Sequence, residues 1–223
     1  MSARDAIMSN IRRSLEARGS DAGRRAIVIA RLDHPPRGVI PERGQLPPDE
    51  RLALFCQIAE EASASIARVP SNDGIPEAVA VYLRDHNLPT EIRMGEDSLL
   101  AGLPWASKTQ ITIAHGPSDG SDAVSVSHAF AGVAETGTVV LISGSDNPTT
   151  LNFLPETHIV MLSAEDIAGD FETVWENIRR RYGKGDMPRT VNMITGPSRS
   201  ADIEHTILLG AHGPKRLHVV IVG

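Results

Sequence analysis

The alternation of predicted strands with predicted helices constrains the fold of this chain more than any other feature. Runs at 138–143, 158–162 and 217–222 are mostly apolar and rich in β-branched residues, as is typical of strands buried on both faces. Helical spacing of apolar residues recurs between them, for example at 76–86 and 165–181. This pattern predicts an α/β fold with a mostly parallel sheet flanked by helices.

Residues 1–48 show a different pattern from the rest of the chain. Residues 2–18 place apolar side chains on one face and predict an amphipathic helix, with a capping box from Ser2 to Asp5. The stretch 19–48 contains five prolines and predicts an extended arm. We therefore expect an N-terminal helix and Pro-rich arm at 1–48 and one folded domain at 49–223.

Composition excludes several classes of function. A net charge of −6 and an aromatic content of 4% argue against binding to nucleic acid. No apolar run approaches the ~18 residues that a membrane-spanning helix needs. The lone cysteine, Cys56, excludes a disulfide framework and an iron–sulfur cluster held by this chain alone. The histidines are scattered without ligand spacing, so no metal site is predicted, and the cytoplasm is the expected compartment.

The segment 194–204, with the sequence ITGPSRSADIE, predicts a strand, a tight turn and a helix running from Ser200 to Leu209. Free N–H groups of the first helical turn, the hydroxyls of Ser198 and Ser200, and the Arg199 guanidinium would together bind an anion. A carboxylate or a phosphate would suit such a site. Ordinary helix capping by Ser200, with Asp202 offsetting the helix dipole, is the alternative.

The segment 132–138, with the sequence GVAETGT, precedes a predicted strand. Its glycine spacing resembles a phosphate-binding loop, but the lysine is missing and the order of strand and helix is wrong. Glu135 lies beside two glycine-containing turns, where an exposed carboxylate would serve as a nucleophile or base. A solvated turn glutamate is the alternative interpretation.

Four segments, taken in order, resemble the lactate utilization protein C family, the LUD-domain proteins: 134–138, 154–160, 194–204 and 210–214. The resemblance implies a NagB/RpiA/CoA-transferase-like fold. It also implies a place in a three-protein cytoplasmic system that oxidises L-lactate to pyruvate. Iron–sulfur clusters are then expected on partner subunits and none on this chain.

The resemblance and the residues together predict a pocket for a small carboxylate or phosphate, with Glu135 as the catalytic candidate. The ligand-binding candidates are Thr136, Gly137, Thr138, Gly196, Ser198, Arg199, Ser200, Asp202 and His212. Two alternatives stay open. The chain would be a non-catalytic assembly subunit whose N-terminal helix docks on an iron–sulfur partner, or a CoA-transferase-like enzyme with Glu135 as its nucleophile.

Overall fold

The computed structural model describes residues 2–15, 21–108, 110–183, 185–201 and 207–223. The chain divides into two compact units, residues 1–38 and residues 39–223. The predicted boundary lay ten residues later, at 48/49.

The N-terminal unit consists of two amphipathic helices, α1 (Ala3–Ser14) and α2 (Ala22–Asp33). The predicted capping box is present, because the Ser2 side chain accepts from the backbone N–H of Asp5 and the Asp5 carboxylate accepts from that of Ser2. Helix α2 contradicts the expectation of an extended arm across 19–48. Asp21 caps it, and the prolines begin only after its last turn, so averaging composition over the whole stretch concealed a helix.

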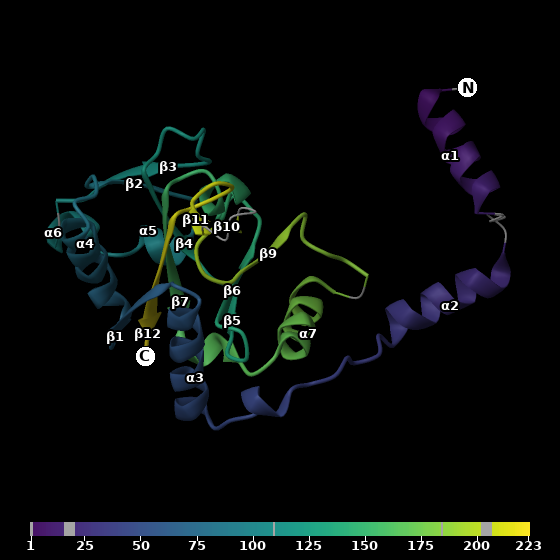
Figure 1. Ribbon diagram of the computed structural model, residues 1–223, viewed down its shortest axis with the longest axis horizontal. Coiled ribbons are helices and arrows are strands. Elements are labelled where there is room, and N and C mark those ends of the chain that lie inside the picture. The colour runs from purple at the N-terminus through teal and green to yellow at the C-terminus, as the bar shows by residue number, and fades with distance from the viewer. Residues whose placement is uncertain (1, 16–20, 109, 184, 202–206) are drawn as a thin grey trace. The chain divides into compact units, whose positions relative to one another are not determined.

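The second unit is built on a six-stranded sheet in which every pairing is parallel, in the order β1-β12-β7-β4-β2-β3 (Figure 1). Its strands are β1 (Ser65–Val69), β2 (Glu91–Met94), β3 (Thr112–His115), β4 (Val124–His128), β7 (Thr157–Ser163) and β12 (Arg216–Val222). The predicted α/β class with a mostly parallel sheet flanked by helices is confirmed. Strand β4 was not predicted.

Both faces of this sheet are covered, which explains the continuous apolar runs. Along β7, Ile159 and Met161 pack on one side with α4 (Ile75–Asp85), α5 (Ser98–Ala101) and α6 (Trp105–Lys108). Val160 and Leu162 pack on the other side with α3 (Pro48–Glu61). Because side chains alternate across a strand, one run of four apolar residues, 159–162, supplies two separate cores.

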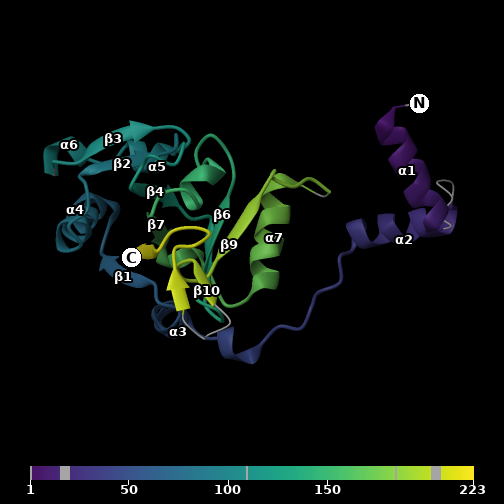
Figure 2. The ribbon, with the colours of Figure 1, turned by 45° about the horizontal axis from the view of Figure 1, so that its top comes forward.

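A second, four-stranded sheet lies on the α3 side, in the order β8-β5-β6-β9. It comprises β5 (Ala131–Val133), β6 (Thr138–Ile142), β8 (Ile167–Ala168) and β9 (Val191–Ile194). Its far face packs on α7 (Phe171–Tyr182), which runs beside β9 in Figure 2. The helix predicted at 165–181 begins late, because its first residues form the 3₁₀ turn Ala164–Asp166 and then β8.

The helix predicted from Ser200 to Leu209 is wrong. The described part of this segment forms an antiparallel hairpin of β10 (Arg199–Ala201) and β11 (Ile207–Leu209), in which Arg199 pairs with Leu209. Helical spacing of a few apolar residues was a weak signal here, since β-branched Ile203, Thr206 and Ile207 favour a strand equally well.

The chain just before α3 packs against the rest of the second unit. The 3₁₀ turn Glu42–Gly44 brings Gly44 so close to the backbone of Gly169 that no β-carbon fits at either glycine. Gln45 then donates from Nε2 to Asp170 Oδ2 at 2.9 Å. Residues 42–45 are therefore part of the folded unit rather than of a free arm. No helix in the described ranges combines the length and the apolarity needed to cross a bilayer.

We expect removal of residues 1–38 to change the unfolding free energy of the remaining chain by less than about 0.5 kcal/mol, because the unit they form is separate. Removal of 1–48 is expected to cost about 1.5–3 kcal/mol, since the hydrogen bond to the Asp170 carboxylate is lost. Chemical denaturation of the two truncated chains measures both values.

Gln45→Ala isolates that hydrogen bond, and Gln57→Ala is its control, because Gln57 bonds to Glu61 on an exposed helix surface. Equal losses of stability in the two truncated chains would contradict the assignment of residues 42–45 to the core.

Candidate functional site

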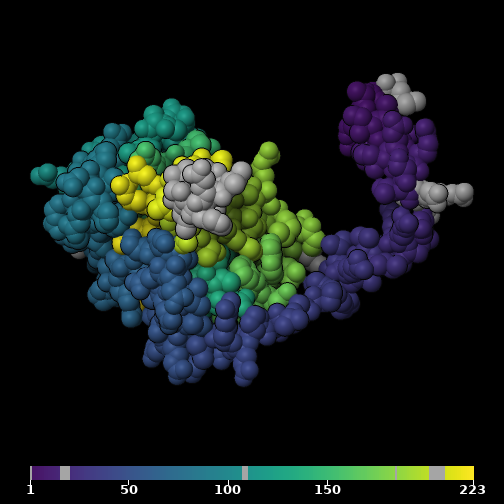
Figure 3. Space-filling model, viewed as in Figure 1, coloured from purple at the N-terminus to yellow at the C-terminus, as the bar shows by residue number. Residues whose placement is uncertain are grey.

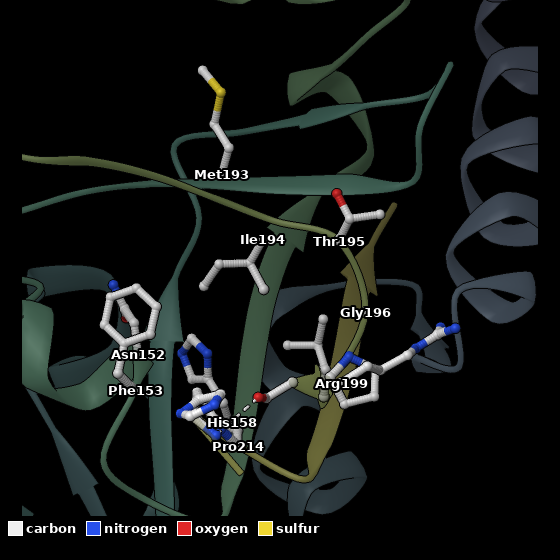
Figure 4. A pocket seen from close by; sticks show the side chains of 14 residues that line it. Asn152, Phe153, His158, Met193, Ile194, Thr195, Gly196, Arg199 and Pro214 are labelled. Atoms are coloured by element: carbon white, nitrogen blue, oxygen red, sulfur yellow. Dashed lines mark hydrogen bonds between the residues drawn. The ribbon is translucent and has the colours of Figure 1, made fainter. Parts of the chain in front are cut away.

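A cavity of about 320 Å³ lies where the two sheets meet near the beginnings of β7 and β12 (Figure 4). The segment 193–199 forms one wall and the loop 212–214 another. His158 and Leu217 from the six-stranded sheet complete the lining, with Asn152 of the 3₁₀ turn η3 (Thr149–Asn152) and Phe153 directly after it. In the space-filling view, the C-terminal segment that contributes to this site reaches the surface beside residues 48–62 (Figure 3).

The turn after β9 is shaped by one glycine. Gly196 has φ +69°, and a β-carbon there would collide with the carbonyl oxygen of Ala62 at the end of α3. The turn is therefore in direct contact with the end of α3. Gly196, predicted as a ligand-binding residue, lines the cavity, and its contact with Ala62 determines the position of the cavity wall formed by 193–199.

Ser198 joins the two cavity walls. Its N–H donates to the carbonyl of Pro214 at 2.8 Å, and its carbonyl accepts from the N–H of Gly210 at 3.0 Å. The Ser198 hydroxyl oxygen accepts from the N–H of His212 at 3.3 Å. Both predicted residues, Ser198 and His212, thus line the cavity, but the amides around them are already engaged within the protein.

Arg199 lines the cavity, yet its guanidinium extends away from Asn152 and His158 (Figure 4). Its Nη2 donates to the carbonyl oxygen of Ala62. The side chain is exposed, and the helix N-terminus expected beside it is absent because Ser200 continues into β10. The predicted anion site at a helix N-terminus is therefore wrong, because the described residues after Arg199 form a strand. Of the predicted positive groups, only the Arg199 guanidinium lies at the rim of the cavity.

The segment 135–138 reaches this site through a chain of hydroxyl groups. The Thr138 hydroxyl lies 2.6 Å from that of Thr195 in the cavity wall and 2.7 Å from that of Thr136. Gly137 has φ +63°, and a β-carbon there would overlap the backbone of Ala59 in α3. The structure thus brings the two predicted segments together, although 135–138 does not line the cavity itself.

Glu135 is buried, with 5% of its surface exposed, so the expectation of an exposed carboxylate is wrong. Its Oε1 accepts from the N–H of Phe171 at 3.4 Å, at the first turn of α7. Its Oε2 has no hydrogen-bond partner among the described residues. The turn folds inward because Gly137 lets it pack on α3, which sequence reasoning did not anticipate. Asp202 lies outside the described residues, and Ser200 lies in β10.

Sequence reasoning missed a buried polar cluster beside the cavity. His158 Nε2 lies 3.0 Å from the Ser127 hydroxyl, which in turn donates to Asn152 Oδ1 at 3.4 Å. Burial lowers the pKa of His158 from 6.5 to about 3, so this imidazole is neutral at physiological pH. The strict Val-Ser-Val-Ser alternation of 124–127 was the signal available, because it predicts a strand with polar residues on one face.

A family model describes the segment that builds most of this site. Residues 118–222 match the LUD domain. This segment is similar to LUD-domain proteins. Apart from the contact of its turns with α3, the cavity is formed wholly within the matched residues.

Several curated proteins that are similar to this chain are named lactate utilization protein C. Lactate utilization protein C of Geobacillus sp. (strain WCH70) is 40% identical over 91 residues, which cover 40% of this chain and 38% of the relative. The protein of that name from Bacillus subtilis (strain 168) is 37% identical over 91 residues, with the same coverage. The chain thus spans about two fifths of the length of these relatives. The resemblance predicted from the sequence is confirmed.

A solved structure shares the fold. The crystal structure of a DUF162 family protein from Deinococcus radiodurans superposes with a TM-score of 0.54 and 21% sequence identity. The match covers 80% of this chain and 99% of that one. This similarity concerns the fold alone, and the predicted likeness to NagB/RpiA/CoA transferases stays a prediction.

We expect Arg199→Ala to weaken binding of a small anionic probe, a carboxylate or inorganic phosphate, by about 1 kcal/mol, roughly fivefold. This is less than a buried charged hydrogen bond contributes, because the guanidinium is exposed and already bonded to Ala62. Arg199→Lys should restore part of the affinity, since an ammonium keeps the charge but loses the planar fork. Isothermal titration and thermal melts of both variants measure these effects. Unchanged affinity with a clearly lowered melting temperature would assign Arg199 to structure alone.

Proposed function

We propose that this chain is a component of a bacterial lactate-utilisation system and that its cavity binds a small carboxylate ligand of that system. The observation that carries the proposal is the LUD-domain match over the residues that form the cavity, together with the names of the curated relatives. Iron–sulfur clusters would reside on partner subunits, because Cys56 is the only cysteine of this chain.

The cavity suits a ligand of this size and charge. A volume of about 320 Å³ is at the small end of ligand pockets, which favours a molecule of a few carbons. Its rim holds one cation, Arg199, among the lining residues, and its inner wall holds the neutral polar groups of Asn152 and His158. A carboxylate at the rim with a small polar body inside matches this distribution.

The arrangement does not favour the CoA-transferase alternative. A glutamate nucleophile must reach the acyl group of a bound thioester. Glu135 is buried against the first turn of α7, outside the cavity lining. The pocket residues therefore support binding more strongly than covalent catalysis by this carboxylate.

Gly213 offers a way to test the cavity in the living cell. A β-carbon at Gly213 would lie in ordinary contact with Ser198 Cβ at 3.4 Å and Phe153 Cδ1 at 4.0 Å, and the backbone there lacks a positive φ. A leucine at this position should fill the cavity while leaving the backbone unstrained.

We expect deletion of the gene in its host to abolish growth on L-lactate as sole carbon source and to spare growth on pyruvate. The wild-type gene should restore growth, and Gly213→Leu should fail to do so because the ligand is excluded. Ala101→Leu, an exposed substitution, is the control, and immunoblotting verifies equal protein levels. Unimpaired growth of the deletion strain on lactate would refute the proposed role.

A second candidate function, assembly without catalysis, is favoured by the N-terminal unit. Residues 1–38 hold eight basic and four acidic residues, a net charge of +4, whereas the fourteen basic and twenty-four acidic residues of 39–223 give −10. Both helices expose apolar side chains, with Ile7 59% and Ile27 55% accessible. A basic amphipathic helix with an unburied apolar face suits docking onto an acidic protein surface.

We expect the full chain to co-purify with the cysteine-rich subunits of its system when they are expressed together, and the chain lacking residues 1–38 to lose this association. Ile7→Ser with Ile11→Ser should weaken the association at least tenfold through lost apolar burial. Ser9→Ala on the same helix is the control. Association that persists without residues 1–38 would exclude the N-terminal unit as the docking element.

A further inference from the structure

The order of the parallel strands indicates a place for a ligand that the cavity described above does not occupy. Strands β2 and β4 are neighbours, yet the next strand of this sheet after β2 is β3, on one side, whereas the next after β4 is β7, on the other. In open α/β sheets ligands bind at such a switch point, outside the carboxyl ends of the strands. The cavity near the beginnings of β7 and β12 lies at the opposite edge.

Two polar side chains meet at this switch point. Asp97 follows β2 by three residues, and His128 is the last residue of β4. His128 Nδ1 lies 3.1 Å from Asp97 Oδ2, while Asp97 Oδ1 accepts from the N–H of Leu100 at 2.9 Å. Because a carboxylate only accepts, Nδ1 carries a proton. The side chain of His128 is 26% exposed, and its Nε2 has no hydrogen-bond partner among the described residues.

A cavity of about 350 Å³ lies beside this pair. It is lined by Phe130, two residues after His128, by Ala131 and Asp166, and by three residues of α7: Asn177, Arg180 and Arg181. Burial raises the pKa of the Asp166 carboxyl, the Glu165 carboxylate raises it further, and the charge of His128 lowers it. His128 is thus close enough to act on a group in the cavity wall.

The two arginines in this wall are held by neutral groups. Arg180 Nη1 donates to Asn177 Oδ1 at 2.9 Å, and the Arg181 guanidinium carbon lies 5.5 Å from the centroid of the Phe130 ring. Both side chains are exposed, and within the described part of the chain neither forms a salt bridge. Their remaining N–H donors form planar forks that suit the oxygens of a phosphoryl group.

We propose that the carboxyl edge of the parallel sheet holds a second ligand site, in which Arg180 and Arg181 bind the phosphoryl group of a small phosphate monoester beside His128. Two guanidinium charges match the charge of about −1.5 to −2 that a monoester carries at pH 7. Asp166 repels an anion, so the organic part of the ligand lies on that side and donates to its carboxylate. The site goes beyond the proposed function, because it does not involve the first cavity.

Isothermal titration of the full chain with glycerol 3-phosphate is the first test. We expect Arg180→Gln and Arg181→Gln each to weaken binding about fivefold, the upper range for an exposed ion pair. Arg179→Gln is the matched control, because it removes the same charge from the same helix at a residue that does not line the cavity. It should change the affinity by less than about twofold. Equal losses in all three variants would trace the effect to overall charge and overturn the inference.

Two further probes define the class of ligand. Inorganic phosphate should bind about threefold more weakly than glycerol 3-phosphate, because it lacks the hydroxyl groups that donate to Asp166. Asp166→Asn should tighten the binding of inorganic phosphate about threefold, since a like charge is removed. Acetate, with a single charge, should bind about tenfold more weakly than glycerol 3-phosphate. Tighter binding of inorganic phosphate or of acetate than of the ester would overturn the assignment.

Histidine ring resonances show where the probe binds. His128 belongs to the proposed site, His212 lines the first cavity, and His86 at the end of α4 lines neither. We expect glycerol 3-phosphate to shift the NMR signals of His128 and to leave those of His212 and His86 unchanged. A shift confined to His212 would place the phosphoryl group in the first cavity and overturn the inference, while leaving the proposed function intact. Failure of every phosphate probe to bind would overturn it as well.

Discussion

The close approach of two glycine turns to the end of α3 determines where the site lies. Gly137 and Gly196 both have positive φ, and at both a β-carbon would overlap the backbone of α3, at Ala59 and at Ala62. The turns belong to β6 and β9, neighbours in the second sheet, so this sheet is held against the helix that covers the six-stranded sheet. The cavity is the space left between the two sheets beside this contact. Larger residues at either glycine would force the sheets apart.

Between these sheets the protein keeps polar groups where apolar packing would be expected. The α3-side face of β7 continues from Val160 and Leu162 to His158, and the neighbouring β4 presents Ser125 and Ser127 on that face. Each serine bonds to η3, one to a carbonyl and one to the Asn152 side chain. Burial disfavours the protonated form of His158, and this lowers the pKa of the imidazole to about 3. Polar residues retained at this cost lie beside the cavity rather than in the centre of the core.

The two units of the chain differ in what they contribute. Residues 39–223 have buried cores on both sheets and contain the cavity, and the short segment 42–45 belongs to them through Gly44 and Gln45. Residues 1–38 bury none of the side chains of α1 or α2 and carry the opposite net charge. The proposed ligand binding and the proposed docking thus fall on different units of the chain.

The amino-acid sequence by itself determined the α/β class, most strands of the parallel sheet, the helical N-terminus and the family resemblance, because apolar periodicity and short motifs are local properties. The predicted runs 158–162 and 217–222, for example, lie within β7 and β12. Only the tertiary structure decided that 199–209 forms a hairpin, that Glu135 turns inward, and that Arg199 bonds to Ala62. It alone brought Ser127, Asn152 and His158 together. These outcomes depend on contacts between residues far apart in the sequence, and the fit of Gly137 and Gly196 against α3 has no local signature beyond the glycines themselves.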